Sequence, residues 1–173
     1  MALVTLPTTI LTERLTLPLW TQADIEAIVD QQGRNGRQQG WHPQFPREDD
    51  RDAATMWVEG DSWSSRYIIR NGTVLGSIGF FGPPDAASDG TPETEVGYGL
   101  VEEARGWGFA TEALKGLLAC ADAEGVRIRA SVEPTNAASL RVLAKCGFTE
   151  LRGADEDGHL VMARPVPGGR MEE

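Results

Sequence analysis

The chain has 173 residues, of which 40% are hydrophobic and 24% are charged. These values are typical of one globular domain and exclude a disordered chain and a fibrous repeat. The formal net charge of −10 argues against sequence-independent binding to nucleic acid and fits a cationic substrate or partner.

The sequence has no run of 18 apolar residues and no basic, apolar and small-residue leader at its N-terminus. We therefore expect a cytoplasmic protein without a membrane span or a signal peptide. In chain order, the first half is predicted to form a strand, a helix, a loop or broken helix, a second short helix and a hairpin. These elements cover residues 11–19, 21–33, 34–50, 52–59, 67–69 and 74–81.

Local signals support two of these elements. Thr21 and Asp24 resemble a capping box, in which the threonine side chain accepts a hydrogen bond from the backbone three residues later. Asn71-Gly72 separates the two β-rich runs of the hairpin, and both residues tolerate the positive φ of a tight turn.

The second half is predicted to alternate between strands and helices. A solvated loop, a strand, a helix, a strand, a helix and a final pair of strands cover residues 85–94, 95–101, 105–125, 126–132, 136–147, 148–151 and 159–163. Apolar residues recur at helical spacing in the first of these helices, and Asn136 is a candidate cap for the second. The order indicates a mixed α/β fold on one sheet, with a domain over residues 1–166 and a frayed tail over 167–173.

The run Arg105-Gly106-Trp107-Gly108-Phe109-Ala110 lies between a predicted strand and the start of a long helix. Its glycines allow a tight turn that gathers several backbone N–H groups, and the helix start adds unpaired donors and a partial positive charge. Such a site binds phosphate without a cationic side chain. The alternative interpretation is that Gly106 and Gly108 only shape the turn.

Two other phosphate-binding motifs do not fit the sequence. It contains no G-x-x-x-x-G-K-[ST], which argues against a P-loop. It also lacks a full G-x-G-x-x-G near the first strand with an acidic residue after the next strand, which argues against a dinucleotide-binding fold.

Arg105-x-x-Gly108-x-Ala110 resembles the acetyl-CoA pyrophosphate motif (Q/R-x-x-G-x-G/A) of the GNAT acyltransferase superfamily. The segments that begin at Glu95 and at Asn136 are similar to its RimJ/RimL-like branch, which acetylates protein N-termini. The resemblance is strongest over residues 95–148 and loose over 30–65. It implies a central, mostly antiparallel sheet that is splayed between its fourth and fifth strands and flanked by about four helices.

The resemblance also implies acetyl-CoA as the cofactor. The residues that it assigns to cofactor binding are Leu100, Val101, Arg105, Gly106, Trp107, Gly108, Phe109, Ala110, Thr111, Asn136, Ser139, Arg141 and Lys145. By position, the backbone amides of 106–111 would wrap the pyrophosphate, and the end of the strand would pair with the pantetheine arm. Asn136 would bind that arm, and Arg141 or Lys145 would meet the outer phosphates.

Two side chains are candidates for the proton transfers of acetylation. Many relatives protonate the leaving thiolate with a tyrosine on the final helix, and because this sequence has none there, Ser139 is the best candidate. Glu95 could accept the proton of the amine, directly or through water. The alternative for Glu95 is an ion pair or a solvated strand end. A backbone N–H near Gly97–Gly99 is expected to hold the oxyanion.

Trp41, His42 and Phe81, together with Glu95, are expected to contact the acceptor. His42 is also an alternative base, since imidazole titrates near neutrality, whereas the alternative interpretation is a surface histidine. We expect no metal site, because the two histidines are far apart and lack matched cysteines or paired acids.

The sequence thus predicts an acetyl-CoA-dependent N-acetyltransferase that acts by direct attack in a ternary complex. The acceptor would be a primary amine, either a protein N-terminus or a small molecule such as an antibiotic or a polyamine. The alternatives are a catalytically inactive acyl-CoA sensor or scaffold, which the missing tyrosine favours, and a nucleotide-binding protein of another α/β fold. We expect no nucleic-acid or membrane partner, and a homodimer is compatible with the resemblance.

Overall fold

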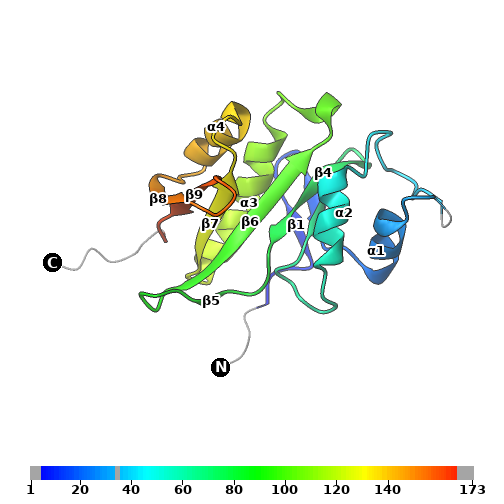
Figure 1. Cartoon of the computed structure of the whole chain (residues 1–173). Coiled ribbons are helices and arrows are strands. Elements are labelled where there is room, and N and C mark those ends of the chain that lie inside the picture. Colours follow the sequence, from blue (N-terminus) through cyan, green and yellow to red (C-terminus); the bar gives the residue numbers. More distant parts are fainter. Residues whose placement is uncertain (1–4, 34–35, 167–173) are drawn as a thin grey trace.

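The structure, a computed structural model, describes residues 5–33 and 36–166 of the chain. In this part of the chain a nine-stranded sheet is surrounded by four α-helices, with α3 behind the sheet and α2 in front of it (Figure 1). The strands are β1 (Thr9–Leu11), β2 (Thr16–Pro18), β3 (Arg66–Arg70), β4 (Thr73–Phe80), β5 (Asp85–Ala86), β6 (Pro92–Leu100), β7 (Arg127–Val132), β8 (Glu150–Ala154) and β9 (Leu160–Arg164). The helices are α1 (Gln22–Val29), α2 (Glu48–Thr55), α3 (Phe109–Ala123) and α4 (Ala137–Lys145), with a 3₁₀ turn η1 (Glu102–Ala104) before α3.

The strands follow the order β1-β2-β3-β4-β6-β7-β9-β8, and the short β5 pairs with the start of β6. The pairings within the described sheet are antiparallel except for the parallel pair β6–β7. The predicted fold class, a mixed α/β protein with one mostly antiparallel sheet and about four helices, is therefore confirmed.

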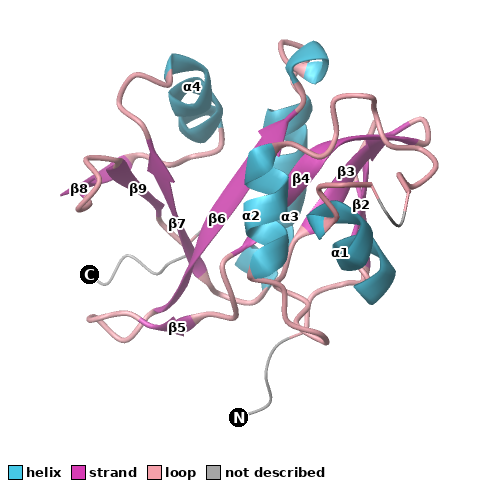
Figure 2. Cartoon of the chain, turned by 45° about the vertical axis from the view of Figure 1, so that its right-hand side comes forward, coloured by secondary structure: helices cyan, strands magenta, loops and turns pink. Residues whose placement is uncertain are grey.

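The sheet opens between β6 and β7. The pairing of β6 with β4 extends to Gly76↔Leu100, whereas its pairing with β7 ends at Glu95↔Arg129. Figure 2 shows the two strands diverging from that point. Residues 96–100 of β6 therefore have a β4 neighbour on one side and the opening of the sheet on the other.

Helix α3 closes one face of the sheet. Its apolar residues Leu114, Leu117 and Leu118 are buried, as the helical spacing predicts. Gly116 faces the β1–β2 hairpin so closely that a Cβ there would lie 2.7 Å from Thr12 Cγ2. The middle of the helix is thereby packed closely against the sheet.

The locally encoded features appear where the sequence predicts them. Thr21 forms the capping box with Asp24 at the start of α1, and Asn136 caps α4 by accepting a 3.0 Å hydrogen bond from the backbone N–H of Ser139. Asn71 and Gly72 have φ angles of 49° and 78° in the β3–β4 turn. Each signal depends on contacts within a few residues, which is why the sequence alone carries it.

Three predictions about element bounds are wrong. The strand predicted over residues 11–19 is broken into β1 and β2, which form a hairpin. The helix predicted over 52–59 spans Glu48–Thr55 and begins after Arg47, because an acidic first turn favours the helix start. The loop predicted over 85–94 contains β5 and the beginning of β6.

The predicted tail at residues 167–173 lies outside the described residues. Among the helices that the structure describes, none is long and apolar enough to cross a membrane.

Candidate functional site

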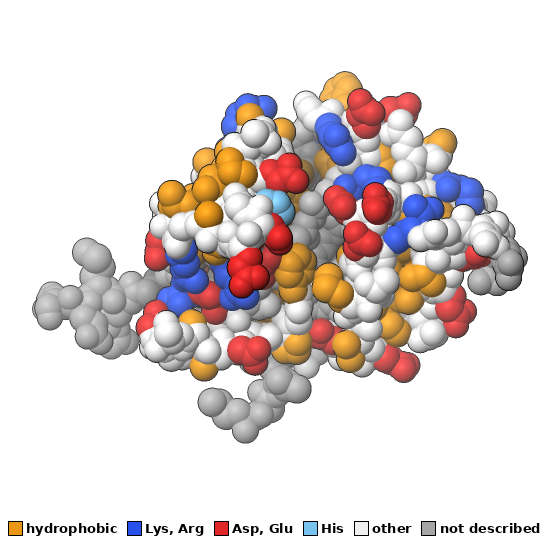
Figure 3. Space-filling view, in the orientation of Figure 1, with side chains coloured by type: hydrophobic (Ala, Val, Ile, Leu, Met, Phe, Trp, Pro, Cys, Tyr) orange, Lys and Arg blue, Asp and Glu red, His pale blue; other side chains and the backbone are white. Residues whose placement is uncertain are grey.

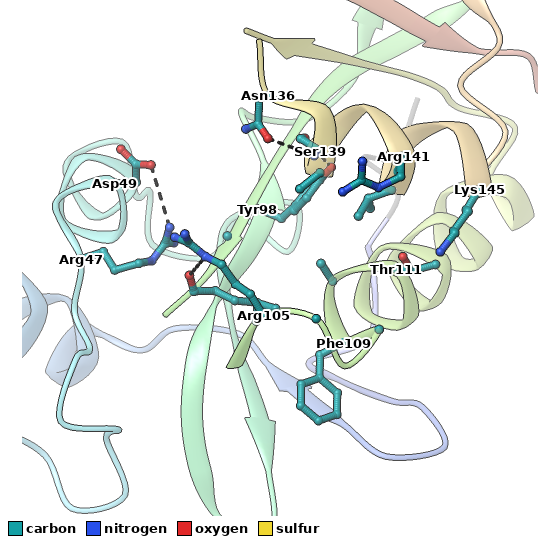
Figure 4. A pocket seen from close by; sticks show the side chains of 17 residues that line it. Arg47, Asp49, Tyr98, Arg105, Phe109, Thr111, Asn136, Ser139, Arg141 and Lys145 are labelled. Atoms are coloured by element: carbon teal, nitrogen blue, oxygen red, sulfur yellow. Dashed lines mark hydrogen bonds and ion pairs between the residues drawn. The ribbon is translucent and has the colours of Figure 1, made fainter. Parts of the chain in front are cut away.

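A cleft of about 440 Å³ lies at the opening of the sheet, between the end of β6, the start of α3 and helix α4 (Figure 4). We call it the central cleft. Most of the residues predicted to bind the cofactor line it: Leu100, Arg105, Gly106, Gly108, Phe109, Ala110, Thr111, Asn136, Ser139, Arg141 and Lys145. Residues that are separated by up to 45 positions in the sequence are thus brought to one cavity.

The start of α3 faces this cleft. Gly106 and Gly108 have φ angles of 87° and 83°, a left-handed backbone that other residues adopt at a cost. The first hydrogen bond of α3 runs from the backbone N–H of Glu112 to the carbonyl of Gly108. The N–H groups of residues 109–111 come before it in the chain. Such amides have no partner within their own helix and carry part of the positive end of its dipole. The cleft therefore has the main-chain donors that an anion needs.

The β1–β2 hairpin holds the loop before α3 in place. Glu112 accepts hydrogen bonds from the Thr12 hydroxyl and from the backbone and Nε of Arg14, at 2.5 to 2.7 Å. Burial alone would raise the pKa of Glu112, but these hydrogen bonds lower it below the usual value, so the carboxylate stays ionised. Arg14 Nη1 also donates to the carbonyl of Trp107 at 3.0 Å. The loop geometry is thus fixed by contacts outside the loop.

Cations gather on the central cleft although the protein is acidic overall. Arg47, Arg105, Arg141 and Lys145 line it, and Asp49 is the one acidic residue among its described lining residues. Arg105 Nε donates to the carbonyl of Leu100 at 3.1 Å, which keeps that side chain against the end of β6. A molecule with a net charge of −10 thus concentrates positive charge where a polyanion would bind.

Along the second half of β6, every second residue points its backbone N–H and C=O groups toward the opening. Phe81 N–H donates to the Glu95 carbonyl, and Val101 N–H donates to the Leu75 carbonyl. The backbone N–H and C=O groups of the odd-numbered residues of β6 therefore point toward β4. Since backbone groups alternate along a strand, those of Tyr98 and Leu100 face the opening. Of the predicted pair Leu100 and Val101, only Leu100 lines the cleft, and the side chain of Val101 is fully buried in the core.

Tyr98 brings a hydroxyl to Ser139 across the opening. The two oxygens lie 2.9 Å apart, and either can be the donor (Figure 4). Burial raises the pKa of Tyr98 above its ordinary value of 10, while the hydrogen bond with Ser139 acts in the opposite direction. The phenol is therefore protonated at neutral pH and can supply a proton near Ser139.

Glu95 lies in a neighbouring pocket of about 380 Å³, which we call the Glu95 pocket. Phe81, Tyr98, Ser139 and His159 also line it. Glu95 Oε1 is 3.3 Å from Arg129 Nε, so the carboxylate has the ion-pair partner that the alternative interpretation foresaw, and it still faces the pocket that Ser139 shares. Figure 3 shows the hollow on this face of the molecule, with acidic side chains on both of its sides.

A buried charge cluster joins β6 to β7 just before the two strands diverge. Glu93 accepts hydrogen bonds from Arg127, Arg129 and Arg152 at 2.6 to 2.9 Å. Burial alone would raise the pKa of Glu93, but the three arginines lower it to about 2. The cluster ties β6 to β7 and β8 at the point from which the strands diverge.

Besides Val101, three predicted site residues lie away from these cavities. Trp107 is 65% exposed and contributes its carbonyl to Arg14. Trp41 packs edge-on against Phe45 and donates through Nε1 to Tyr67, and His42 bonds Glu103 at 3.0 Å through Nε2. Trp41 and His42 lie outside the central cleft and the Glu95 pocket, because Trp41 pairs with Val74 near the end of β4 opposite Phe80.

Three residues at the site were not singled out from the sequence as binding or catalytic: Tyr98, Arg47 and His159. Tyr98 stood within the segment that carries the family resemblance, but its partner Ser139 is 41 residues away. The signal that the sequence offered for Tyr98 was its place near the end of the strand that borders the opening. Arg47 and His159 had no local signal, because tertiary contacts alone bring them there.

Comparisons with known proteins agree with this geometry. Residues 14–149 match a family model described as "Acetyltransferase (GNAT) domain". A search of curated proteins finds no match. Among solved structures, an acetyltransferase from Agrobacterium tumefaciens is 23% identical and has a TM-score of 0.63, with 94% of this chain and 97% of that chain covered.

Two further solved structures carry more specific names. Ribosomal-protein-S5-alanine acetyltransferase from Vibrio fischeri is 17% identical, with a TM-score of 0.65 and coverage of 95% of this chain and 100% of that chain. RimJ from Mycobacterium smegmatis, in complex with CoA-disulfide, is 23% identical, with a TM-score of 0.58 and coverage of 91% and 87%. These likenesses describe a shared fold.

Proposed function

Because the chain belongs to the GNAT acetyltransferases, we propose that it transfers an acetyl group from acetyl-CoA to a primary amine by direct attack in a ternary complex. The observation that carries this proposal is the central cleft, where the first amides of α3, the backbone edge of β6 and four cationic side chains face one cavity. Each of these features suits a different part of acetyl-CoA.

The residues present fit acetyl-CoA. The amides at the start of α3 are donors for the diphosphate, and Arg141 and Lys145 are cations for the outer phosphates. The β6 edge at Leu100 and the side chain of Asn136 are partners for the amides of the pantetheine arm. When bound, acetyl-CoA supplies the activated thioester, and this chain's residues position it and move the protons.

Two proton transfers complete the reaction. A bond forms between the amine nitrogen and the acetyl carbon while the carbon–sulfur bond breaks, so the nitrogen loses a proton and the sulfur gains one. Glu95 accepts the first proton, directly or through water, from its position in the pocket beside Ser139. The hydrogen-bonded hydroxyls of Tyr98 and Ser139 donate the second.

Tyr98 weakens the case for a catalytically inactive sensor. That alternative rested on the lack of a tyrosine on the final helix, and a tyrosine from β6 approaches Ser139 instead. A general acid is therefore available at the same end of the cleft.

Release of free thiol tests the proposed function. The protein is incubated with acetyl-CoA and a panel of amines that includes peptides, amino-acid amides and polyamines, and a thiol reagent follows the reaction. We expect amine-dependent release of thiol by the wild-type protein. Binding of acetyl-CoA without release for any amine would favour the sensor, and no binding at millimolar acetyl-CoA would contradict both functions.

A further inference from the structure

Arg47 is held at the central cleft by a fully buried carboxylate. Asp50 accepts hydrogen bonds from the Nε and Nη2 atoms of Arg47, at 3.1 and 2.7 Å, and from the hydroxyl of Ser77 at 2.5 Å. Asp50 is 0% exposed. Because a buried carboxylate must keep its partners, the arginine has little freedom to leave this position.

The remaining edge of the guanidinium points toward the cleft. Asp50 occupies Nε and Nη2, whereas Nη1 has Asp49 at 3.9 Å, beyond hydrogen-bond distance (Figure 4). Nη1 lies directly over Gly99 of β6, and a Cβ on that glycine would overlap it. The guanidinium thus rests on the strand that borders the opening, with Nη1 as its available donor.

A second pocket begins where Arg47 stands. This α2 pocket, of about 260 Å³, lies between α2 and the strands β4 and β6. Its walls are mostly apolar and include Ala53, Met56 and Phe81. Arg47, Asp49 and Tyr98 line both this pocket and the central cleft, so a group in the α2 pocket is next to the region where the thioester is proposed to lie.

We propose that Arg47 selects acceptors that carry a carbonyl oxygen next to the amine, and that the α2 pocket receives their apolar side chain. This inference rests on the proposed function and names its acceptor class, an apolar α-aminoacyl compound. A guanidinium has only donors to offer, so it binds an acyl oxygen. Both an amino-acid carboxylate and a peptide carbonyl present such an oxygen.

Matched substrates separate this recognition from simple amine reactivity. Leucinamide and leucine carry the same apolar group as isopentylamine, but isopentylamine has no carbonyl. We expect kcat/KM, calculated for the neutral amine because an α-amino group is less basic than an alkylamine, to be about tenfold to a hundredfold higher for leucinamide or leucine than for isopentylamine, since a charged donor loses one hydrogen bond with the latter. The better of the two carbonyl compounds identifies an amide or a carboxylate as the preferred source of the oxygen.

Variants test whether Arg47 is responsible. Arg47→Met should reduce this preference to less than threefold, about the range of a lost surface contact, without raising the KM for acetyl-CoA in proportion. Arg37→Met is the matched control, since Arg37 is an exposed arginine of the same connecting segment and lies outside both cavities. The control should keep the preference.

Two glycine variants keep the test valid if Arg47→Met does not fold. Gly99→Ala keeps the charge of Arg47 but displaces its guanidinium, because Nη1, Nη2 and Cζ all lie too close to the added carbon, so it should lower the preference for a carbonyl. Gly97→Ala, two residues earlier on the same strand face, displaces Phe81, whose Cε1 lies 2.8 Å from the added carbon. It should instead lower the preference for leucinamide over glycinamide.

The outcomes are distinct from those of the proposed function, which is decided by turnover of any amine by the wild-type protein. If the wild type acetylates amines but leucinamide and leucine are no better than isopentylamine, the role of Arg47 is wrong and the proposed function stands. An equal loss for every amine in Arg47→Met, with a raised KM for acetyl-CoA, would also overturn it, because Arg47 would then be a cofactor contact.

Discussion

The central cleft and the α2 pocket meet at Arg47, Asp49 and Tyr98, yet they are built in different ways. One wall of the central cleft consists of main-chain groups, the first amides of α3 and the edge of β6, and the residues that form it follow one another closely in the chain. The α2 pocket is lined mainly by side chains, which come from Arg47 and α2 and from the region of β4 and β6.

This difference explains why the two cavities can change independently. A site made of amides depends on glycines and helix geometry, and the adjoining side chains can be replaced without removing its donors. A pocket made of side chains changes its shape and charge with each substitution. We therefore expect the cofactor to be set by the fold and the acceptor to be set by a few residues such as Arg47 and Phe81.

The largest effect is expected on the acceptor side, from Glu95→Gln. Loss of the base should lower kcat about 10²- to 10⁴-fold while the affinity for acetyl-CoA changes little, because Glu95 lies in the Glu95 pocket and not among the lining residues of the central cleft. Steady-state thiol release measures the rate and calorimetry the affinity. Glu156→Gln, an exposed carboxylate on the β8–β9 turn, is the control. A wild-type rate for Glu95→Gln would leave the carboxylate as an ion-pair partner of Arg129 alone.

Glu93→Gln should destabilise the part of the sheet in which the charge cluster joins β6 to β7 and β8. Removing one charge from the buried cluster should lower the free energy of unfolding at pH 7 by about 3 kcal/mol. The contribution of the Glu93 carboxylate to the free energy of unfolding should also depend on pH, because its pKa is about 2 in the folded protein and 4.5 without these contacts. It is complete above pH 4.5 and is lost as the pH falls toward 2.

Denaturant unfolding of both proteins between pH 2 and pH 7 measures this effect. The difference in stability between wild type and Glu93→Gln should shrink as the pH falls. A constant difference across this range would mean that the carboxylate's charge has no part in holding β6 to β7.

Tyr98→Phe tests the point at which the cavities meet. The loss of the phenol should lower kcat about tenfold to a hundredfold, less than the loss of the base, because a thiolate leaves readily without full protonation. Since burial raises the pKa of Tyr98, the wild-type rate should show no decline attributable to this residue below pH 10. Ser139→Ala provides the comparison, and an unchanged rate in both variants would rule out this hydroxyl pair as the acid.

The smallest effect is expected from the cations of the central cleft. Arg141→Ala should weaken the binding of acetyl-CoA about tenfold at low salt and less at high salt, since partly exposed charges are screened. Calorimetry at two ionic strengths measures it. Salt-independent binding would mean that Arg141 does not face the phosphates.

The sequence predicts the parts of this molecule that depend on neighbouring residues. The capping box at Thr21, the turn at Asn71-Gly72 and the cap at Asn136 each involve residues within four positions of one another. The start of α2 was misplaced by four residues, because its cap is Arg47, a residue type that seldom begins a helix. The buried Asp50 that holds Arg47 could not be foreseen, since its burial comes from Ser77 on β4.

The candidate site divides in the same way. The residues from Arg105 to Thr111 form one continuous loop and helix start, and most of them line the cleft as the motif predicts. Trp41 and His42 were predicted to contact the acceptor from their place in the loop over residues 34–50, where the resemblance is loose, and long-range pairing with β4 takes them elsewhere. Tyr98 and Ser139 meet only because β6 and α4 border the same opening of the sheet.

The most direct test of the central claim, that main-chain donors at the start of α3 hold a diphosphate, is a pair of calorimetric titrations. The wild-type protein is titrated with acetyl-CoA and with S-acetylpantetheine, which has the same thioester arm but lacks the diphosphate and the adenosine 3′-phosphate attached to it. We predict one acetyl-CoA per chain and an affinity about a hundredfold or more above that for S-acetylpantetheine, since several charge-assisted hydrogen bonds are lost with the diphosphate. Equal affinities for the two compounds, or no binding of acetyl-CoA at millimolar concentration, would contradict the claim.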